Sequence, residues 1–340
     1  MKTNSVAVRS VTIAAAAALT IGVATPGMMS ANAQVGEVRE VDGVRVSDST
    51  IDTSAKGTLT IYKKANPTDG GHVPTGEVDA SATGTALEGA GFTLYKVTNA
   101  DLSNNAGIAD ASNLTVATAQ QGAAVGAEQI TDAEGKANWG ELPVGVYILR
   151  ETTTPKGYSP AADSLVFVPM TRQNATNGGT QWLYDITAYP KNTSQQQPEK
   201  KVEDSGQNVG DTVKYTIDTW AQTVRDGQYR TIYRIEDTLD EALDAENATV
   251  QVTPESFAEG TDYTVDKNGQ NIVVEFTDAG VAKIENGQQI SATIEATVKK
   301  DILTDGALEN KARQIQNNPN SNQKTKENET PNETPEVKTY

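Results

Sequence analysis

The chain has 340 residues, a formal net charge of −17, no cysteine and a single histidine, His72. This composition argues against nucleic-acid binding, which needs a basic surface, and it excludes disulfides and a two-histidine zinc motif. His72 lies in a loop-like Gly- and Pro-rich run and no G-x-S-x-G sequence is present, so no serine-hydrolase triad is predicted. Abundant Thr, Val, Asn, Asp and Gly favour strands and turns over helices.

The N-terminus has the order of a secretory signal peptide. Lys2 and Arg9 precede an apolar run over 11–24, and Ala31-Asn32-Ala33 follows it. The apolar run is shorter than the roughly 20 residues of a membrane-spanning helix. We therefore expect a signal peptide over 1–33, a secreted mature chain starting near Gln34, and a flexible leader over 34–56, where no period is sustained.

Two strand-rich blocks follow, separated by a polar linker over 193–199. Strand patterns in the first block cover 57–63, 91–98, 144–151, 164–170 and 182–192. Residues 99–140 are ambiguous, and a short helix over 117–127 is one interpretation. Strand patterns in the second block cover 212–219, 229–235, 249–252, 263–265, 271–276 and 290–298. We predict an all-β fold of two tandem immunoglobulin-like β-sandwich domains over 57–192 and 200–316, with an extended linker over 317–340.

Polar residues of the first block share the face of apolar ones. With a period of two, Lys63 aligns with Leu59 and Ile61, and Glu151 aligns with Tyr147 and Leu149. In the stretch 182–192, Asn192 aligns with Trp182, Ile186 and Ala188, while its neighbour Lys191 points to the opposite face with Tyr189. A lysine, a carboxylic acid and an asparagine are thus predicted to point inward.

The second block repeats this arrangement. Lys200 aligns with Val202, Asp237 aligns with Tyr233 and Ile235, and Asn310 aligns with Leu308 and Ala312. Burial lowers a lysine pKa and raises a carboxyl pKa, so a neutral amine could attack the asparagine amide, release ammonia and leave a Lys–Asn isopeptide bond. The alternative is that these polar groups decorate strand ends and their parity is accidental.

Two longer motifs resemble the sortase-assembled backbone pilins of Gram-positive bacteria. The run Tyr147-Ile-Leu149-Arg-Glu151-Thr152-Thr-Thr-Pro155-Lys-Gly157-Tyr158 resembles their E-box, with Thr154 in place of the usual alanine. The run from Trp182 to Lys191 resembles their pilin motif, in which Trp182, Tyr189, Pro190 and Lys191 match. The resemblance extends through the second block and covers nearly all of the mature chain.

The resemblance implies a CnaB-like domain followed by a CnaA-like domain and a structural role without turnover catalysis, cofactor or metal. Lys191 would attack an acyl-enzyme formed by a class C sortase, joining pilin subunits into a covalent cell-wall polymer. In the second domain Lys200, with Lys201 as the alternative, would bond to Asn310 with help from Asp237. In the first domain Lys63 would bond to Asn192 with help from Glu151, a bond that some relatives lack.

The resemblance also implies a C-terminal domain and an LPxTG-type sorting signal, and we expect this chain to be a truncated product of such a pilin. An alternative function is a secreted adhesin module that binds a host matrix protein or glycan through the loops 65–90 and 99–127. A wall or glycan hydrolase has no identifiable acid pair. The acidic loop 204–211 could bind calcium, although it does not match an EF-hand.

Overall fold

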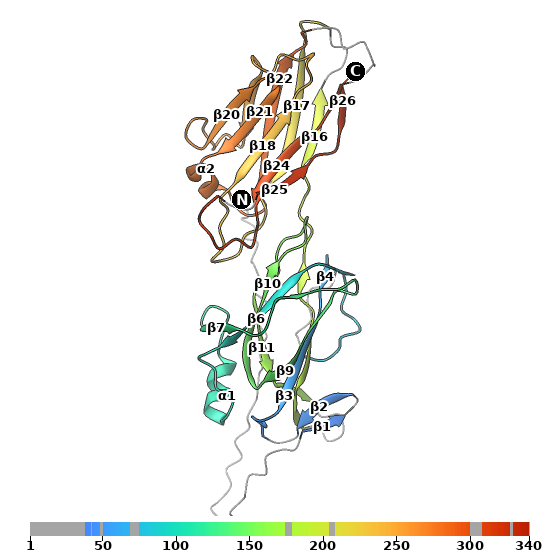
Figure 1. Cartoon of the computed structure of the whole chain (residues 1–340), viewed down its shortest axis with the longest axis vertical. Helices are drawn as coiled ribbons and strands as arrows, with labels where there is room; N and C mark the ends of the chain where they lie inside the picture. Colours follow the sequence, from blue (N-terminus) through green and yellow to red (C-terminus); the bar gives the residue numbers. More distant parts are fainter. Residues whose placement is uncertain are drawn as a thin grey trace, which may run out of the picture. The chain divides into compact units, whose positions relative to one another are not determined.

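The computed structural model describes residues 38–339 except 42, 48–49, 69–74, 174–178, 204–207, 300–307 and 327–328. They divide into two compact units: the first runs up to Pro155 and resumes over Ala161–Thr193, and the second contains Lys156–Pro160 and the residues from Ser194 onward. Figure 1 shows that strands are the main regular structure of both units. The predicted all-β fold of tandem β-sandwiches is confirmed. The predicted signal peptide and His72 lie outside the described residues.

The first unit packs several small sheets around one apolar core. Its strand orders are β1–β2–β13–β12, β11–β10–β6–β7 with β8 also on β6, β14–β3–β9, and β15–β4–β5. The elements are β1 (Arg39–Val41), β2 (Val44–Ser47), β3 (Lys56–Tyr62), β4 (Lys64–Ala65), β5 (Thr85–Ala86), β6 (Gly91–Val97), α1 (Asn105–Ser112), β7 (Gln121–Ala124), β8 (Gln129–Ile130), β9 (Lys136–Pro143), β10 (Gly145–Thr153), β11 (Ser164–Val168), β12 (Met170–Gln173), β13 (Thr180–Leu183), β14 (Asp185–Ala188) and β15 (Lys191–Asn192).

Strands β3 and β4, early in the first unit, are parallel neighbours of its last two strands, β14 and β15. Strand β14 pairs with β3, with Ile186 opposite Leu59, and β15 pairs with β4, with Asn192 opposite Ala65. Apolar residues alternate with polar ones along β3, so Leu59 and Ile61 point into the core and their neighbours do not. The two chain segments therefore run side by side.

The predicted flexible leader is wrong for residues 39–47. Strands β1 and β2 form an antiparallel pair, and β2 extends the sheet through β13, where Val46 lies opposite Leu183. Val46 is fully buried, and the sequence Val44-Arg-Val-Ser47 alternates apolar and polar residues as a strand does. Four residues are too few for this alternation to stand out in a charged segment.

The expected helix over 117–127 is also wrong, since β7 occupies residues 121–124 and pairs with β6. The helix of this region, α1, begins earlier, where the side chain of Asn104 accepts a hydrogen bond from the Gly107 amide and caps the first turn. Gly122 and Gly126 disfavour a helix in the predicted segment.

The single strand predicted over 182–192 is three strands, β13, β14 and β15, which belong to three sheets. The alternation changes phase at the first break, because Leu183 and Tyr184 are both buried. Trp182 therefore does not share the inward face of Ile186 and Asn192, contrary to the prediction. From Asp185 onward the predicted faces agree with the burial.

The second unit is a sandwich of the sheets β16–β17–β22–β19 and β20–β21–β18–β24–β25, with β23 paired to β26. Its core includes Tyr215, Tyr233, Phe276 and Ile294, drawn from both sheets. The elements are β16 (Glu199–Glu203), β17 (Thr212–Trp220), β18 (Tyr233–Thr238), β19 (Thr249–Thr253), β20 (Tyr263–Asn268), β21 (Asn271–Phe276), α2 (Asp278–Lys283), β22 (Gln289–Thr297), β23 (Leu308–Asn310), β24 (Ala312–Asn317), β25 (Glu329–Glu333) and β26 (Val337–Thr339).

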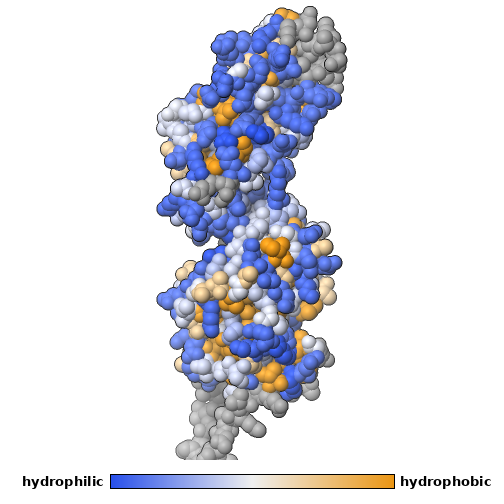
Figure 2. Space-filling model, in the orientation of Figure 1, coloured by the Kyte–Doolittle hydropathy of each residue, from blue (hydrophilic) through white to orange (hydrophobic). Residues whose placement is uncertain are grey.

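Part of the segment predicted as an extended linker, 317–340, instead belongs to the second unit. Strand β25 adds to the sheet edge, with Pro331 opposite Ile315, and β26 pairs with β23. The sequence hides these strands because β25 is almost wholly exposed and lacks apolar alternation. Figure 2 shows polar residues over most of the visible face of the described part of the chain. None of the described helices has the length and apolar character needed to cross a membrane.

Candidate functional site

The first unit buries a lysine, a glutamate and an asparagine against one another, and we call Lys63, Glu151 and Asn192 the first-unit triad. Lys63 lies between β3 and β4, Glu151 lies on β10, and Asn192 lies on β15. Their exposed fractions are 0%, 1% and 2%, respectively. The inward orientation predicted from parity agrees with this burial.

The Glu151 carboxylate bridges the two nitrogens of the first-unit triad. The Lys63 amine (Nζ) donates to Glu151 Oε2 at 2.9 Å, and the Asn192 amide (Nδ2) donates to Glu151 Oε1 at 2.8 Å. Lys63 Nζ also donates to the amide oxygen Asn192 Oδ1 at 2.6 Å. The amine is thus held against the amide group, and one carboxylate contacts both the amine and the amide nitrogen.

The surroundings explain why the lysine can be buried. The Ala161 backbone amide donates to Glu151 Oε2 at 2.8 Å, and the Phe92 ring centre lies 5.1 Å from the Lys63 amine. Phe92 is the register partner of Glu151 on the neighbouring strand β6, so the pairing that places the acid also places the ring. The Gly135 backbone oxygen accepts from the Lys63 amide, and a side chain at Gly135 would come within 2.5 Å of the Lys63 carbonyl.

The second unit holds a similar group across its sandwich, the second-unit triad of Lys200, Asp237 and Asn310. Lys200 projects from β16 in one sheet, and its amine lies 2.5 Å from Asp237 Oδ2 on β18 in the other sheet. All three residues are buried, and the Tyr215 ring centre lies 4.5 Å from the amine. Asn310, on β23, lies at the Asp237 carboxyl, but neither atom of its amide makes a hydrogen bond of normal geometry.

Burial shifts both ionisable groups of the second-unit triad toward their neutral forms. Desolvation lowers the pKa of Lys200 to about 8, although the Asp237 carboxylate partly offsets it. Desolvation likewise raises the pKa of Asp237 above its ordinary value, against the opposing effect of Lys200. A neutral amine is the form that attacks an amide, and a carboxyl group that exchanges protons readily can carry the proton from the amine to the departing nitrogen.

Lys191 immediately precedes Asn192 of the first-unit triad, and the two residues face opposite sides of strand β15. It is half-exposed, whereas the adjacent Asn192 is buried. Lys191 sits opposite Lys64 in the parallel pair of β15 with β4. The preceding Tyr189 is held in place, because its ring stacks on Tyr62 with centres 5.7 Å apart and its hydroxyl accepts from the Asp79 amide at 2.9 Å. A fixed strand therefore presents the Lys191 side chain at the surface.

An ion pair ties the N-terminal strand pair to this strand region. Arg45 on β2 donates through Nη2 to Asp185 Oδ1 on β14 at 2.6 Å, and the Thr58 hydroxyl donates to the same oxygen at 2.9 Å. Burial raises the pKa of Asp185, but the hydrogen bonds from Arg45 and Thr58 outweigh it and leave that pKa below its ordinary value. Asp185 is therefore a structural carboxylate.

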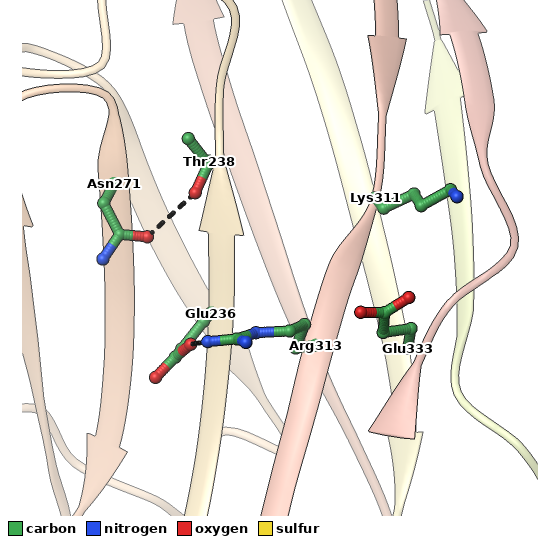
Figure 3. Close-up of a pocket in the computed structure, with 6 residues that line it drawn as sticks. All are labelled: Glu236, Thr238, Asn271, Lys311, Arg313 and Glu333. Carbon is green, nitrogen blue, oxygen red and sulfur yellow. Dashed lines mark hydrogen bonds and ion pairs between the residues drawn. The ribbon is translucent and has the colours of Figure 1, made fainter. Parts of the chain in front are cut away.

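A hollow of about 350 Å³ lies on the outer face of the second unit (Figure 3), lined by Glu236, Thr238, Asn271, Lys311, Arg313 and Glu333. Arg313 is paired with Glu236, and Thr238 donates to Asn271 at 3.2 Å. Its charges are engaged in part with one another, so the hollow is a weaker candidate than the triads. The side chains of β18 alternate here, because Glu236 lines the hollow on the outer face while Asp237 is buried.

Two family models match parts of this chain. Residues 54–193 match the family described as Gram-positive pilin subunit D1, N-terminal domain, and residues 189–328 match the Sgo0707 N2 domain. The fimbrial subunit type 2 of Actinomyces naeslundii is 32% identical over 293 residues, which are 78% of this chain and 54% of that protein. The fimbrial subunit type 1 of Actinomyces viscosus is 28% identical over 321 residues, 87% of this chain and 60% of that protein. This chain thus spans little more than half of either relative.

A solved structure extends the likeness. The full-length major pilin SpaD from Corynebacterium diphtheriae matches with a TM-score of 0.55 and 34% identity, over 86% of this chain and 68% of that chain. The chain belongs to the Gram-positive pilin subunits. The resemblance expected from the E-box and the pilin motif is confirmed.

The E-box of the pilin is a buried strand followed by a turn. Leu149 is buried, and the Tyr147 hydroxyl donates to the Pro143 carbonyl at 2.5 Å, while burial raises the pKa of Tyr147 to about 12. Thr152 donates to Glu128 at 2.6 Å. The remaining E-box residues, Pro155, Gly157 and Tyr158, leave β10, with Gly157 at a φ of +84° and Tyr158 in a bridge to Ser194.

Other residues of the pilin refine the prediction. Lys201, the alternative to Lys200, has a side chain 62% exposed and pairs with Asp218 at 2.6 Å, away from Asp237. Ala161 and Phe92 also contact the first-unit triad, and neither was predicted as a site residue. Phe92 could have been found from its place in the strand predicted over 91–98, whereas a backbone donor such as Ala161 has no sequence signal. Residues 204–207 of the acidic loop lie outside the described part of the chain.

Proposed function

We propose that this pilin is secreted and polymerised on the cell surface through Lys191 by a class C sortase. The Lys191 amine would attack the acyl-enzyme formed with the sorting signal of another subunit. The carbon–nitrogen bond forms as the enzyme leaves the acyl carbon and the amine loses a proton, so the product is an intermolecular amide.

The observation that supports this proposal is the alternation at the end of the pilin motif. Lys191 is half-exposed while Asn192 is buried, and β15 is held on the parallel strand β4. An acceptor amine must reach an enzyme-bound acyl group, so it has to lie at the surface on a fixed strand. The neighbour of that amine faces the core and is free to act within its own unit.

We further propose that the first-unit triad forms an internal isopeptide bond between Lys63 and Asn192. The neutral Lys63 amine attacks the side-chain carbonyl carbon of Asn192, and the carbon–nitrogen bond to the amide nitrogen breaks. Glu151 takes a proton from the amine through Oε2 and returns one to the departing nitrogen from Oε1, which leaves as ammonia. The contacts at 2.9 and 2.8 Å support this path because the carboxylate already touches both nitrogens.

The same chemistry is proposed for the second-unit triad, where Lys200 bonds to Asn310 and Asp237 carries the proton. Two observations support it: the lowered pKa of Lys200, and the position of the buried Asn310 amide at the Asp237 carboxyl, where neither amide atom makes a hydrogen bond of normal geometry to the described residues. The bond would replace a buried amine and a buried primary amide by a single secondary amide, which leaves fewer polar groups to be satisfied in the core. The product would join β16 to β23, the strand that pairs with β26.

A sortase labelling experiment tests the role of Lys191. The purified pilin is incubated with a class C sortase and a fluorescent acyl-donor peptide, and the labelled residue is identified by peptide mass spectrometry. We expect the label on Lys191, its loss in Lys191→Ala, and its retention in Lys64→Ala, the matched control on the paired strand. Labelling of Lys191→Ala at the parent rate would refute the assignment. Binding to a host matrix protein or glycan without any polymer would instead favour the adhesin.

Intact mass tests the internal bonds. Each bond removes one ammonia, so the chain should be lighter than its sequence by two ammonia masses after allowance for its N-terminus. Digestion should yield cross-linked peptides that contain Lys63 with Asn192 and Lys200 with Asn310. A mass equal to that of the unmodified chain would eliminate both bonds.

A further inference from the structure

The C-terminal strand of the described chain lies beside both bonding partners of the second-unit triad. Strand β26 pairs antiparallel with β23, and this pairing sets Val337 opposite Asn310. The same strand lies against β16, which carries Lys200, as Figure 1 shows. The short strand β26 therefore contacts the two strands that the proposed bond would join.

Alternation along β26 separates an apolar inner side from a charged outer side. Val337 is partly buried and packs against the apolar core of the second unit, as does Val202 on β16. Its neighbour Lys338 is exposed and pairs with Glu309 at 2.6 Å, and Glu336 lies 3.6 Å from Lys311. The charges of β26 and the adjoining chain thus pair outside, and an apolar side chain points inward.

The chain that leads into β26 is also fixed. Thr334 is buried, its hydroxyl accepts a hydrogen bond from the Ala312 amide at 3.0 Å, and its own amide donates to the Ala312 carbonyl at 2.9 Å. Ala312 lies two residues after Asn310 and opposite Asp237 in the pairing of β24 with β18. The anchor of the segment is therefore close to the acid of the triad.

We propose that β26 shields the second-unit triad from water and that Val337 is a positioning residue for the reaction between Lys200 and Asn310. The inference rests on the proposed internal bond. The Val337 side chain is apolar, so it makes no hydrogen bond to the reacting atoms. It acts by keeping the environment of the amine apolar and by holding β23, with Asn310, in register.

The charged and titratable groups around Lys200 make this shielding consequential. Asp237 from β18 is the carboxyl that faces the amine, and the Tyr215 ring from β17 packs beside it. On β23 and β26 the charged side chains are Glu309 and Lys338, which pair with each other. No described charge other than Asp237 pairs with Lys200, so desolvation controls how much neutral amine is present.

The expected change in the rate of bond formation follows from the effect of burial on the Lys200 pKa. The Lys200 pKa of about 8 depends on burial, and water admitted at β26 would return it toward its ordinary value. A return of about one unit lowers the neutral amine fraction at pH 7 about tenfold, whereas well above both pKa values the fractions converge. A loss of shielding therefore slows formation of the bond at pH 7, and the rate recovers at high pH.

The experiment compares Val337→Ser with Lys338→Ser in the full chain. The two positions are adjacent and lie on opposite sides of β26. Each chain is prepared unfolded in denaturant, refolded by dilution at a series of pH values from 6.5 to 10, and sampled over time. Peptide mass spectrometry then measures the Lys200–Asn310 and Lys63–Asn192 bonds separately. The Lys63–Asn192 bond, in the other unit, is the internal control.

We expect Val337→Ser to slow the Lys200–Asn310 bond about tenfold at pH 7, with the midpoint of the pH–rate profile raised by about one unit and the rate recovered near pH 10. Val337→Thr, which keeps the β-branched shape, should shift the midpoint the same way by less. Lys338→Ser should match the parent, and the Lys63–Asn192 bond should be unchanged in all variants. A parent-like pH profile in Val337→Ser would overturn the inference, as would equal slowing at every pH. If the parent never forms the bond, the proposed function fails instead.

Discussion

Replacement of Asn192 by alanine is the sharpest test of the first-unit triad, because it removes the bond and leaves the Lys63–Glu151 ion pair in place. The proposed bond closes a loop of 129 residues. The chain-entropy treatment of a cross-link gives about 5 kcal/mol for a loop of this length, and the lost hydrogen bond to Glu151 adds about 1 kcal/mol. At roughly 2–4 °C per kcal/mol for a unit of this size, we expect the first transition to fall by about 12–24 °C.

Scanning calorimetry measures this change, and intact mass reports the bond in the same sample. The matched control is Lys191→Ala, one residue away and half-exposed, which should keep both the bond and the transition temperature. The two variants should also separate in the sortase assay, where Asn192→Ala still accepts the acyl group below its melting transition and Lys191→Ala does not. With the Lys200–Asn310 bond intact, Asn192→Ala should be lighter than its sequence by one ammonia. A mass lighter by two ammonia, or a shift of less than about 3 °C, would refute the reasoning.

Further predictions concern the second-unit triad and the Arg45–Asp185 ion pair. Asp237→Ala should leave the Lys200–Asn310 bond unmade, so its mass should exceed that of the bonded chain by one ammonia after allowance for the substitution, and a bond formed at the parent rate would contradict the proton-carrier role. In Asn310→Ala the bond cannot form, and the folded Lys200 pKa of about 8 lies below the unfolded value near 10.5. Between these two pH values the unfolded state binds more protons than the folded state, so the free energy of unfolding should rise with pH by about 3 kcal/mol. Denaturant titrations should show this rise in the variant and not in the bonded parent. Asp185→Asn should cost the first unit about 2 kcal/mol through the weakened bonds from Arg45. Because the Asp185 pKa is lowered on folding, that contribution should be present above about pH 3.9 and fade below it, and equal stability of the variant and the parent at pH 7 would contradict it.

Strand alternation was enough to predict the buried members of both triads. Lys63 follows Leu59 and Ile61 at a spacing of two, and Asp237 follows Tyr233 and Ile235 in the same way, so each inherits the inward direction of its strand. Alternation is a local property, and it is reliable wherever a strand runs unbroken up to the residue in question. The prediction for Trp182 was wrong because a break at Tyr184 changes the phase.

The long-range arrangement of the sites could not be read in this way. That Glu151 bridges both nitrogens depends on how one sheet packs on another, which no local spacing encodes. The strand β25 has little apolar character, so it is recognisable only through its partner β24. The short strand β2 was missed because four residues give two inward positions, too few to distinguish alternation from chance.

The adjacency of Lys191 and Asn192 has a mechanical consequence. In the proposed polymer, tension from the preceding subunit enters the backbone at Lys191 and continues along the chain through Asn192 toward Lys200. The fold of residues 54–190 then lies off the line of force. At Lys200 the load would cross the side-chain bond to Asn310, so the intervening loop could not be pulled out. A pulled fibre built this way would behave as a nearly inextensible tether.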